Sequence, residues 1–228
     1  MLLLTYMKPA RLDELSDGIF AIVMTIIVFE IKVPNIPILF NDMQLWLAIK
    51  TLFPSFISYM LSFALLFTYW RAHHFFVSIY AKNIDTKLTN INALFFMLIA
   101  LIPFSSNLLG HFSQSKLAIT IFGIHTILIG LSLYWMRNYV LYSEHIKNPE
   151  ISKREIRGST IRTLVPVIFS VIAIPLSFYS WKFALSLFSL AIIFNLFPYS
   201  TILFDNLIKT LNNIFYKPTK DSSLNEEL

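Results

Sequence analysis

The chain has 228 residues, of which 56% are hydrophobic and only 14% are charged. A soluble domain of this length needs more charge on its surface, so the composition predicts a polytopic membrane protein with one compact domain. The absence of cysteine excludes disulfides and thiolate metal sites. The net charge of +5 comes from basic residues in loops between apolar runs, which membrane topology explains better than a nucleic-acid partner.

Six segments are long enough to cross about 30 Å of hydrocarbon as helices. They are residues 15–33, 46–70, 88–109, 117–141, 163–179 and 181–203. We therefore expect an all-α membrane protein with six transmembrane helices per subunit in a lipid bilayer, occupying residues 1–215. The residues after Tyr216 are polar and free of aromatics, and we expect 216–228 to be a disordered cytoplasmic tail.

The distribution of lysine and arginine predicts the orientation. An even number of spans puts both termini on one side, and most of the basic residues fall in the loops of that side. The opposite loops hold only Lys32, Lys116 and Lys182, with Lys50 at the mouth of the second span. We expect both termini to be cytoplasmic, in a cell inner (plasma) membrane. Since the N-terminus lacks signal-peptide features, the first span itself would direct insertion.

One substantial polar loop connects the predicted fourth and fifth spans, at residues 142–162. Its mixed charge predicts a short helical extension at the cytoplasmic surface. A solvated connector and a regulatory element both remain open for it.

The first span carries a narrow apolar stripe, because four of its residues share one face at about 100° per residue. They are Ile22, Thr25, Ile26 and Phe29. Gly18 lies near this face, while Asp17 points roughly 140° away from it on the same geometry. We interpret the first span as a pore-lining helix whose acid is bound by its neighbours. A stripe that faces lipid or a packed core is the alternative.

An ion pathway along this stripe would have to pass side chains, since no carbonyl-filter motif of the TVGYG type occurs in the chain. From Ile22 to Phe29 the apolar constriction would span about 10 Å. A hydrophobic ring of that length can close a pore by dewetting, with the Thr25 hydroxyl as the only side-chain oxygen along it. One helix cannot enclose a pore, so several copies around a symmetry axis are required.

Four groups of polar residues lie near membrane depth, where such residues are functional candidates. They are Ser16 with Asp17, the stretch Trp70 to His74, Asn90 with Asn92, and Glu30. The first three lie near the cytoplasmic ends of the first three spans and can therefore meet. An ionised Asp17 needs donors, which Arg11, Trp70, His73, His74 or the Asn amides can supply. A structural network, helix capping and direct ion or proton handling all remain open.

Neither an enzyme nor a metal site is expected. His73 and His74 are adjacent on a helix and face different directions, and no third ligand has metal-like spacing. The chain also lacks a Ser/His/Asp arrangement, an H-E-x-x-H motif and a Gly-rich phosphate loop. We expect no cofactor.

Three patches of the sequence resemble the transmembrane protein 175 family, the lysosomal and bacterial potassium channels. The first patch is Arg11-x-x-x-Leu15-Ser16-Asp17-Gly18 at the start of the first span, where Leu15 replaces the phenylalanine of the family signature. The second is Trp70 with His73 at the end of the second span, and the third is Asn92 with Pro103 and Phe104 in the third. The similarity covers most of the first three spans.

This resemblance implies a six-helix subunit of the single-repeat bacterial type, a homotetramer, and a pore lined by the first helix. The tightest apolar ring would correspond to Ile22, with further rings at Ile26 and Phe29 and a selectivity-related hydroxyl layer at Thr25. The resemblance also implies that a network of side chains holds this helix without touching ions. Its members are Arg11, Ser16, Asp17, Trp70, His73 and Asn92.

The first hypothesis is therefore a homotetrameric, potassium-preferring cation channel, in which Glu30 near the outer mouth attracts cations. The second is a proton-coupled secondary transporter that uses Asp17 and His73 as a relay. The third is a non-conducting membrane scaffold whose cytoplasmic loop binds a partner.

Overall fold

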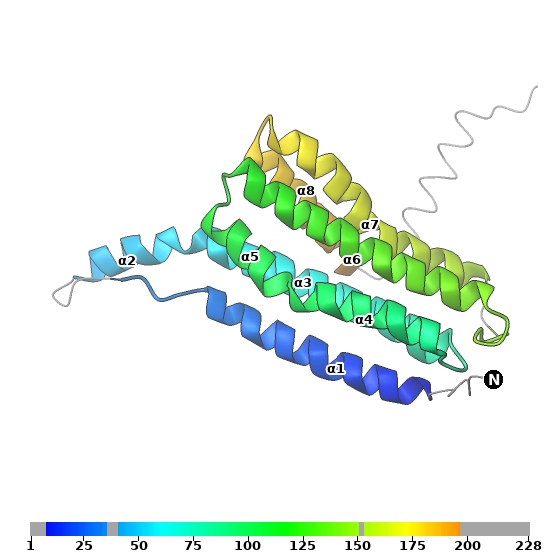
Figure 1. The fold of residues 1–228 in the computed structure, drawn as a ribbon. Coiled ribbons are helices and arrows are strands. Elements are labelled where there is room, and N and C mark those ends of the chain that lie inside the picture. Colours follow the sequence, from blue (N-terminus) through cyan, green and yellow to red (C-terminus); the bar gives the residue numbers. More distant parts are fainter. Residues whose placement is uncertain (1–7, 36–40, 151–152, 197–228) are drawn as a thin grey trace, which may run out of the picture. The chain divides into compact units, whose positions relative to one another are not determined.

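The computed structural model describes residues 8–35, 41–150 and 153–196, and within them every regular element is a helix (Figure 1). This confirms the predicted all-α fold class. The elements in chain order are α1 (Pro9–Ile26), a 3₁₀ turn η1 (Ile27–Glu30), α2 (Asp42–Thr51), α3 (Phe53–His74), a π-helical turn η2 (Phe75–Ile79), α4 (Thr86–Ala100), α5 (Ile102–His111), α6 (Lys116–Tyr142), α7 (Lys153–Ser177) and α8 (Trp181–Leu196). The predicted tail at 216–228 lies outside the described residues.

Prolines divide two of the predicted spans. Pro54 and Pro103 each lie in the first turn of a helix, α3 and α5 respectively. Because proline has no N–H and disfavours a helical residue before it, the chain breaks at Leu52 and Leu101. The predicted second span thus becomes α2 and α3, and the third becomes α4 and α5.

The first helix begins earlier and ends earlier than its apolar run indicates. α1 starts at Pro9, where a proline needs no helical partner for its nitrogen. It tightens into η1 at Ile27, and regular helix ends at Glu30, so the last residues of the predicted span are not helical. Hydropathy therefore located this span but not the ends of its helix.

Four helical segments of the described chain are long and apolar enough to cross a membrane. They are Phe53–Ile79, Thr86–His111, Lys116–Tyr142 and Gly158–Ser177. α1 carries four charged residues in its first half, and the apolar run of α8, Trp181–Asn195, is shorter. The count of six spans therefore remains a prediction.

Two glycines of α6 let side chains of α7 pack directly against the α6 backbone. A Cβ added at Gly130 would lie 2.3 Å from Val167 Cγ2, and one at Gly123 would lie 2.8 Å from Ile174 Cγ1. Small residues at helix interfaces are typical of membrane proteins, because tight packing replaces the missing hydrophobic driving force. α3 in turn contacts α5 and α8, and α1 packs along α3 and α4 (Figure 1).

Candidate pore helix and its polar network

One face of α1 is buried in the helix bundle. Leu12, Ser16, Phe20 and Val23 follow the four-residue and three-residue spacing of a single helical face, and all are buried. The Phe20 ring lies 6.0 Å from the Phe95 ring of α4. This face fixes the rotation of α1, and with it the direction in which every other residue of the helix points.

The opposite face of α1 is open. Ile22 is 59% exposed and Phe29 is 74% exposed, and Thr25 and Ile26 are exposed as well. No atom outside the helix lies within 4 Å of a Cβ placed at Gly18. The four residues Ile22, Thr25, Ile26 and Phe29, here called the α1 stripe, thus form an apolar surface that no other described part of the chain covers.

The Thr25 hydroxyl is bonded inside its own helix. Its Oγ1 lies 2.9 Å from the carbonyl oxygen of Ala21 and 2.8 Å from that of Ile22. A hydroxyl has one proton and two lone pairs. Since the proton is donated to the backbone, the lone pairs on the exposed side remain available to accept a hydrogen bond or to coordinate a cation.

Asp17 lies on the flank of α1 and is bound by α3. The Trp70 indole Nε1–H donates to Asp17 Oδ1 at 2.7 Å. Of the donors that the sequence made candidates, Trp70 is the one that reaches this carboxylate. His74 instead pairs with Asp13, at 2.9 Å between Nδ1 and Oδ2. Asp13 was not among the candidate residues, although it lies four residues before Asp17 and so on the same flank.

His73 and Asn92 form a separate, buried pair. His73 Nε2 lies 2.7 Å from Asn92 Oδ1, both side chains have 0% exposure, and the His73 ring stacks on Phe95 at 5.3 Å. Because the amide oxygen can only accept, Nε2 carries the proton in this pair.

The six residues of the predicted network are therefore not all joined. Trp70 with Asp17 and His73 with Asn92 make two hydrogen-bonded pairs. Ser16 is buried but its hydroxyl has no hydrogen-bond partner in the described structure. Arg11 is exposed, and no hydrogen bond or ion pair joins its side chain to another described residue. The two pairs connect α1 to α3 and α3 to α4.

Glu30 at the far end of α1 is bound to α5. The side-chain amide of Asn107 donates to the Glu30 carboxylate, and Glu30 is only partly exposed. The sequence predicted only that the charge of Glu30 attracts cations near the outer mouth, and it did not indicate Asn107 as a partner. Nothing in the spacing of residues 30 and 107 links them, because α5 meets η1 only through the packing of the bundle.

Known proteins similar to this chain were found by sequence and by structure. A family model described as the endosomal/lysosomal potassium channel TMEM175 matches residues 11–103. A potassium channel of Chryseobacterium sp. (strain P1-3) is 28% identical over 195 residues, which cover 84% of this chain and 94% of that protein.

The fold agrees over nearly the same length. The crystal structure of a lysosomal potassium-selective channel TMEM175 homolog from Chamaesiphon minutus matches with a TM-score of 0.70 and 25% identity, covering 82% of this chain and 95% of that chain. The chain is therefore similar to the TMEM175 family in sequence and in fold. The resemblance inferred from the three sequence patches is thereby confirmed.

A mammalian member of the TMEM175 family is related over part of its length. The mouse endosomal/lysosomal proton channel TMEM175 is 26% identical over 181 residues, which are 74% of this chain and 36% of the mouse protein. This chain thus corresponds to about a third of the mouse protein, and to nearly all of the two bacterial relatives.

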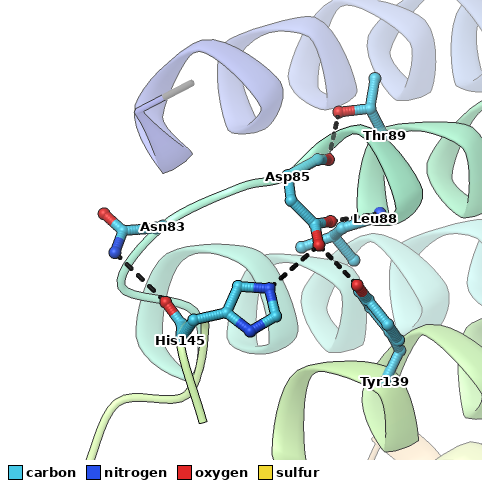
Figure 2. A network of polar contacts seen from close by, with 6 residues as sticks. All are labelled: Asn83, Asp85, Leu88, Thr89, Tyr139 and His145. Atoms are coloured by element: carbon cyan, nitrogen blue, oxygen red, sulfur yellow. Dashed lines mark hydrogen bonds and ion pairs between the residues drawn. The ribbon is translucent and has the colours of Figure 1, made fainter. Parts of the chain in front are cut away.

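A second polar cluster joins the α3–α4 connection to the end of α6 (Figure 2). We call Asn83, Asp85, Tyr139 and His145 the Asp85 clasp. Asp85 caps α4 by accepting from the Leu88 N–H at 2.8 Å, and it also accepts from the Tyr139 hydroxyl at 2.5 Å. His145 Nε2 lies 3.2 Å from the same carboxylate, and Asn83 donates to the His145 carbonyl.

The clasp lowers the pKa of Asp85. Burial alone would raise that pKa, but the hydrogen bonds from Tyr139, from the Leu88 N–H and from His145 favour the charged form and outweigh it. Backbone bonds extend the contact, since Lys82 N–H donates to the Ile146 carbonyl at 2.7 Å and Asn148 N–H to the Tyr80 carbonyl at 2.8 Å. The loop that the sequence left open as a solvated connector is therefore docked, at its first residues, on the α3–α4 connection.

Metal ligands do not converge in the described part of the chain: no three or more His, Asp or Glu side chains there lie close enough to hold an ion. His73 and His74 are engaged with Asn92 and Asp13 respectively.

Proposed function

We propose that this chain is a potassium-preferring cation channel of the plasma membrane, formed by four identical subunits around a pore that α1 lines. The observation that carries the proposal is the α1 stripe. It is apolar, it contains one hydroxyl, and it stays exposed while the opposite face of the same helix is buried. The names of the bacterial relatives, which are potassium channels, support the same ion.

In this proposal Ile22 forms the narrowest ring, Ile26 and Phe29 form further rings, and Thr25 contributes to selectivity. Four isoleucine side chains at one level exclude water when they meet, so a closed state needs no charged gate. The lone pairs of four Thr25 hydroxyls would offer oxygen ligands to a dehydrated cation, and oxygen donors are the ligands that hard cations prefer.

The Trp70–Asp17 and His73–Asn92 pairs position α1 in this proposal and do not contact ions. Rotating α1 about its axis by one residue position turns each side chain of the α1 stripe by about 100°. The stripe therefore faces the pore only if the rotation of α1 is fixed. Asp17 is bound on the flank by Trp70, and the buried His73–Asn92 pair fixes the two helices against which α1 packs. Glu30, which Asn107 binds, would contribute negative charge at the outer mouth.

We place both termini on the cytoplasmic side, because the lysine and arginine residues concentrate in the loops of that side. The Asp85 clasp then faces the cytoplasm, and α2 and Glu30 face the exterior.

Proton conduction is the second candidate, because the mouse relative is a proton channel. A relay from Asp17 to His73 has a weak structural basis: His73 is fully buried, and its Nε2 is already bound to Asn92. Protons would instead pass along water in the same pore as potassium.

Ion flux from the purified full-length protein in liposomes tests the proposal. Ile22→Asn replaces the apolar ring with amides that hold water, so we expect a potassium leak several times that of the unaltered protein. Leu128→Asn is the matched control, because Leu128 on α6 is also exposed, at 47%, but lies away from α1. Equal flux for the unaltered, Ile22→Asn and Leu128→Asn proteins would remove Ile22 from the pathway. A pH gradient in the same liposomes distinguishes proton flux.

A further inference from the structure

A groove lies where α2 joins α3 and where the chain leaves η1. Its volume is about 490 Å³, within the range of roughly 300–1,000 Å³ that holds small molecules. Six residues form most of its lining: Ile31, Trp46, Ile49, Lys50, Phe53 and Phe56. All are apolar except Lys50, so the groove offers an apolar slot with one positive charge.

The depth of this groove follows from helix geometry. Arg71 lies 18 residues after Phe53 in α3, which is about 27 Å at 1.5 Å per residue, and Lys50 precedes Phe53 by three residues across the break at Leu52. The hydrocarbon layer is about 30 Å thick. With Arg71 at one boundary of the hydrocarbon, Lys50 therefore lies at the other, while Phe53 and Phe56 lie on its hydrocarbon side. Figure 1 shows α2 continuing past the end of α1 at this level.

Lys50 is available to an anion. Its Nζ lies 5.3 Å from the centre of the Trp46 ring, and no carboxylate in the described ranges pairs with it. Tryptophan and lysine side chains are enriched at the level of lipid headgroups, where one end of the side chain is apolar and the other is wet. Phe53 and Phe56, at 64% and 50% exposure, extend the apolar surface toward the bilayer centre.

We infer that this groove binds one anionic phospholipid, with its phosphate at Lys50 and an acyl chain along Ile49, Phe53 and Phe56. The lipid belongs to the outer leaflet in the orientation proposed above. A second copy of the chain fits the groove less well, because lysine is depleted from the centres of protein interfaces and would lose its water there without gaining a partner.

The site connects the lipid to the candidate pore helix. Ile31, which lines the groove, follows η1 directly, and η1 carries Phe29 of the α1 stripe. Where the chain is a channel as proposed, a bound lipid stabilises the end of the pore helix and alters ion flux. The binding site itself does not depend on conduction.

Lipid binding to the full-length protein tests the inference, with phosphatidylglycerol and phosphatidylcholine as probes in native mass spectrometry. We expect phosphatidylglycerol to bind more tightly than phosphatidylcholine, and Lys50→Gln to weaken it about fivefold, as expected for one surface lysine near anionic lipid. Lys182→Gln is the matched control, because Lys182 also lies over a tryptophan ring, that of the partly buried Trp181, at 5.6 Å but outside the groove. The Lys182→Gln protein should bind phosphatidylglycerol as tightly as the unaltered protein does.

Ile49→Trp provides a second variant that fills the groove while leaving the core unchanged, since Ile49 is 44% exposed. It should reduce binding of both lipids. Equal affinities for the unaltered and Lys50→Gln proteins would overturn the inference. So would an Ile49→Trp protein that falls apart into single subunits, because the groove would then be filled by another copy. Potassium flux in phosphatidylcholine liposomes reports on the channel proposal separately.

Discussion

Asp17 adds a hydrogen bond to the buried face that fixes the orientation of α1. It lies on the flank of the helix, between the buried face and the α1 stripe, and its carboxylate accepts from Trp70. A charge-assisted bond of this kind is stronger than one between neutral groups. Trp70 therefore couples the rotation of α1 to α3.

Trp70→Phe removes this donor and keeps an aromatic ring. We expect the free energy of unfolding to fall by about 1 kcal/mol, the net value of a typical hydrogen bond. The measurement is thermal unfolding in detergent micelles. Trp135→Phe is the control, because Trp135 on α6 is 51% exposed and its indole makes no hydrogen bond to the described part of the chain. Equal melting points for both variants would contradict a positioning role for Trp70.

Asn92→Leu tests the buried pair. The leucine has the same number and branching of side-chain heavy atoms as asparagine but leaves His73 Nε2 buried without an acceptor, which costs about 1–3 kcal/mol. Asn90→Leu is the control on the same helix, because Asn90 is exposed. We expect a clear drop in the melting point for Asn92→Leu and almost none for Asn90→Leu. A larger drop in melting point for Asn90→Leu than for Asn92→Leu would show that the His73–Asn92 bond does not stabilise α4.

Individual hydrogen bonds were predictable from the sequence only where a residue had few possible partners. Trp70 was among the few donors near Asp17, and His73 and Asn92 fell at the same depth. The pairs Asp13 with His74 and Glu30 with Asn107 were not predicted. They depend on how two helices far apart in the chain rotate against each other, and this rotation follows from the packing of the whole bundle.

At the scale of elements, the apolar runs located the helices but not their ends. The apolar run of the first span continues to Val33, yet regular helix ends at Glu30. Hydropathy measures the polarity of side chains and does not report the conformation of the backbone. Pro54 and Pro103 could have indicated the breaks at Leu52 and Leu101, because a proline in a first turn is a common helix start. The helical extension predicted before the fifth span is present, as α7 begins at Lys153.

The Asp85 clasp, which joins two elements, makes the stability of the fold depend on pH. The pKa of Asp85 in the folded protein lies below its ordinary value of 3.8. A carboxyl group of this kind stabilises the fold above the pKa of the unfolded chain, and this stabilisation is lost as the pH falls through the folded pKa. We therefore expect the contribution of the clasp to be intact at neutral pH and to begin to disappear as the pH falls below about 4.

Asp85→Asn separates the charge from the helix cap, because asparagine also caps helices well. The variant should be less stable at pH 7 by about 1 kcal/mol, and the difference from the unaltered protein should shrink on acidification. Melting points between pH 7 and pH 3 give the measurement. Asp42→Asn is the control, since Asp42 is an exposed acid in the first turn of α2. A difference that does not change with pH would contradict the clasp as described.

At the scale of the whole molecule, composition alone predicted the class of protein, and three short patches of sequence predicted the similarity to the TMEM175 family. Assembly is the part that one chain does not determine. The α1 stripe is exposed in a single subunit, and an exposed apolar stripe packs equally well against lipid, against another protein or around an axis. A pore lined by α1 therefore requires that Ile22 of one copy approach Ile22 of the next.

Because the natural chain contains no cysteine, single cysteines provide a direct test of this approach. Ile22→Cys is oxidised in native membranes, and the products are separated by mass without reductant. Convergence on a shared axis predicts a disulfide-linked dimer of subunits. Trp135→Cys, exposed on α6, predicts none. If Ile22→Cys stays monomeric while the purified protein is an oligomer, the α1 stripe does not line a common pore, and the central claim is wrong.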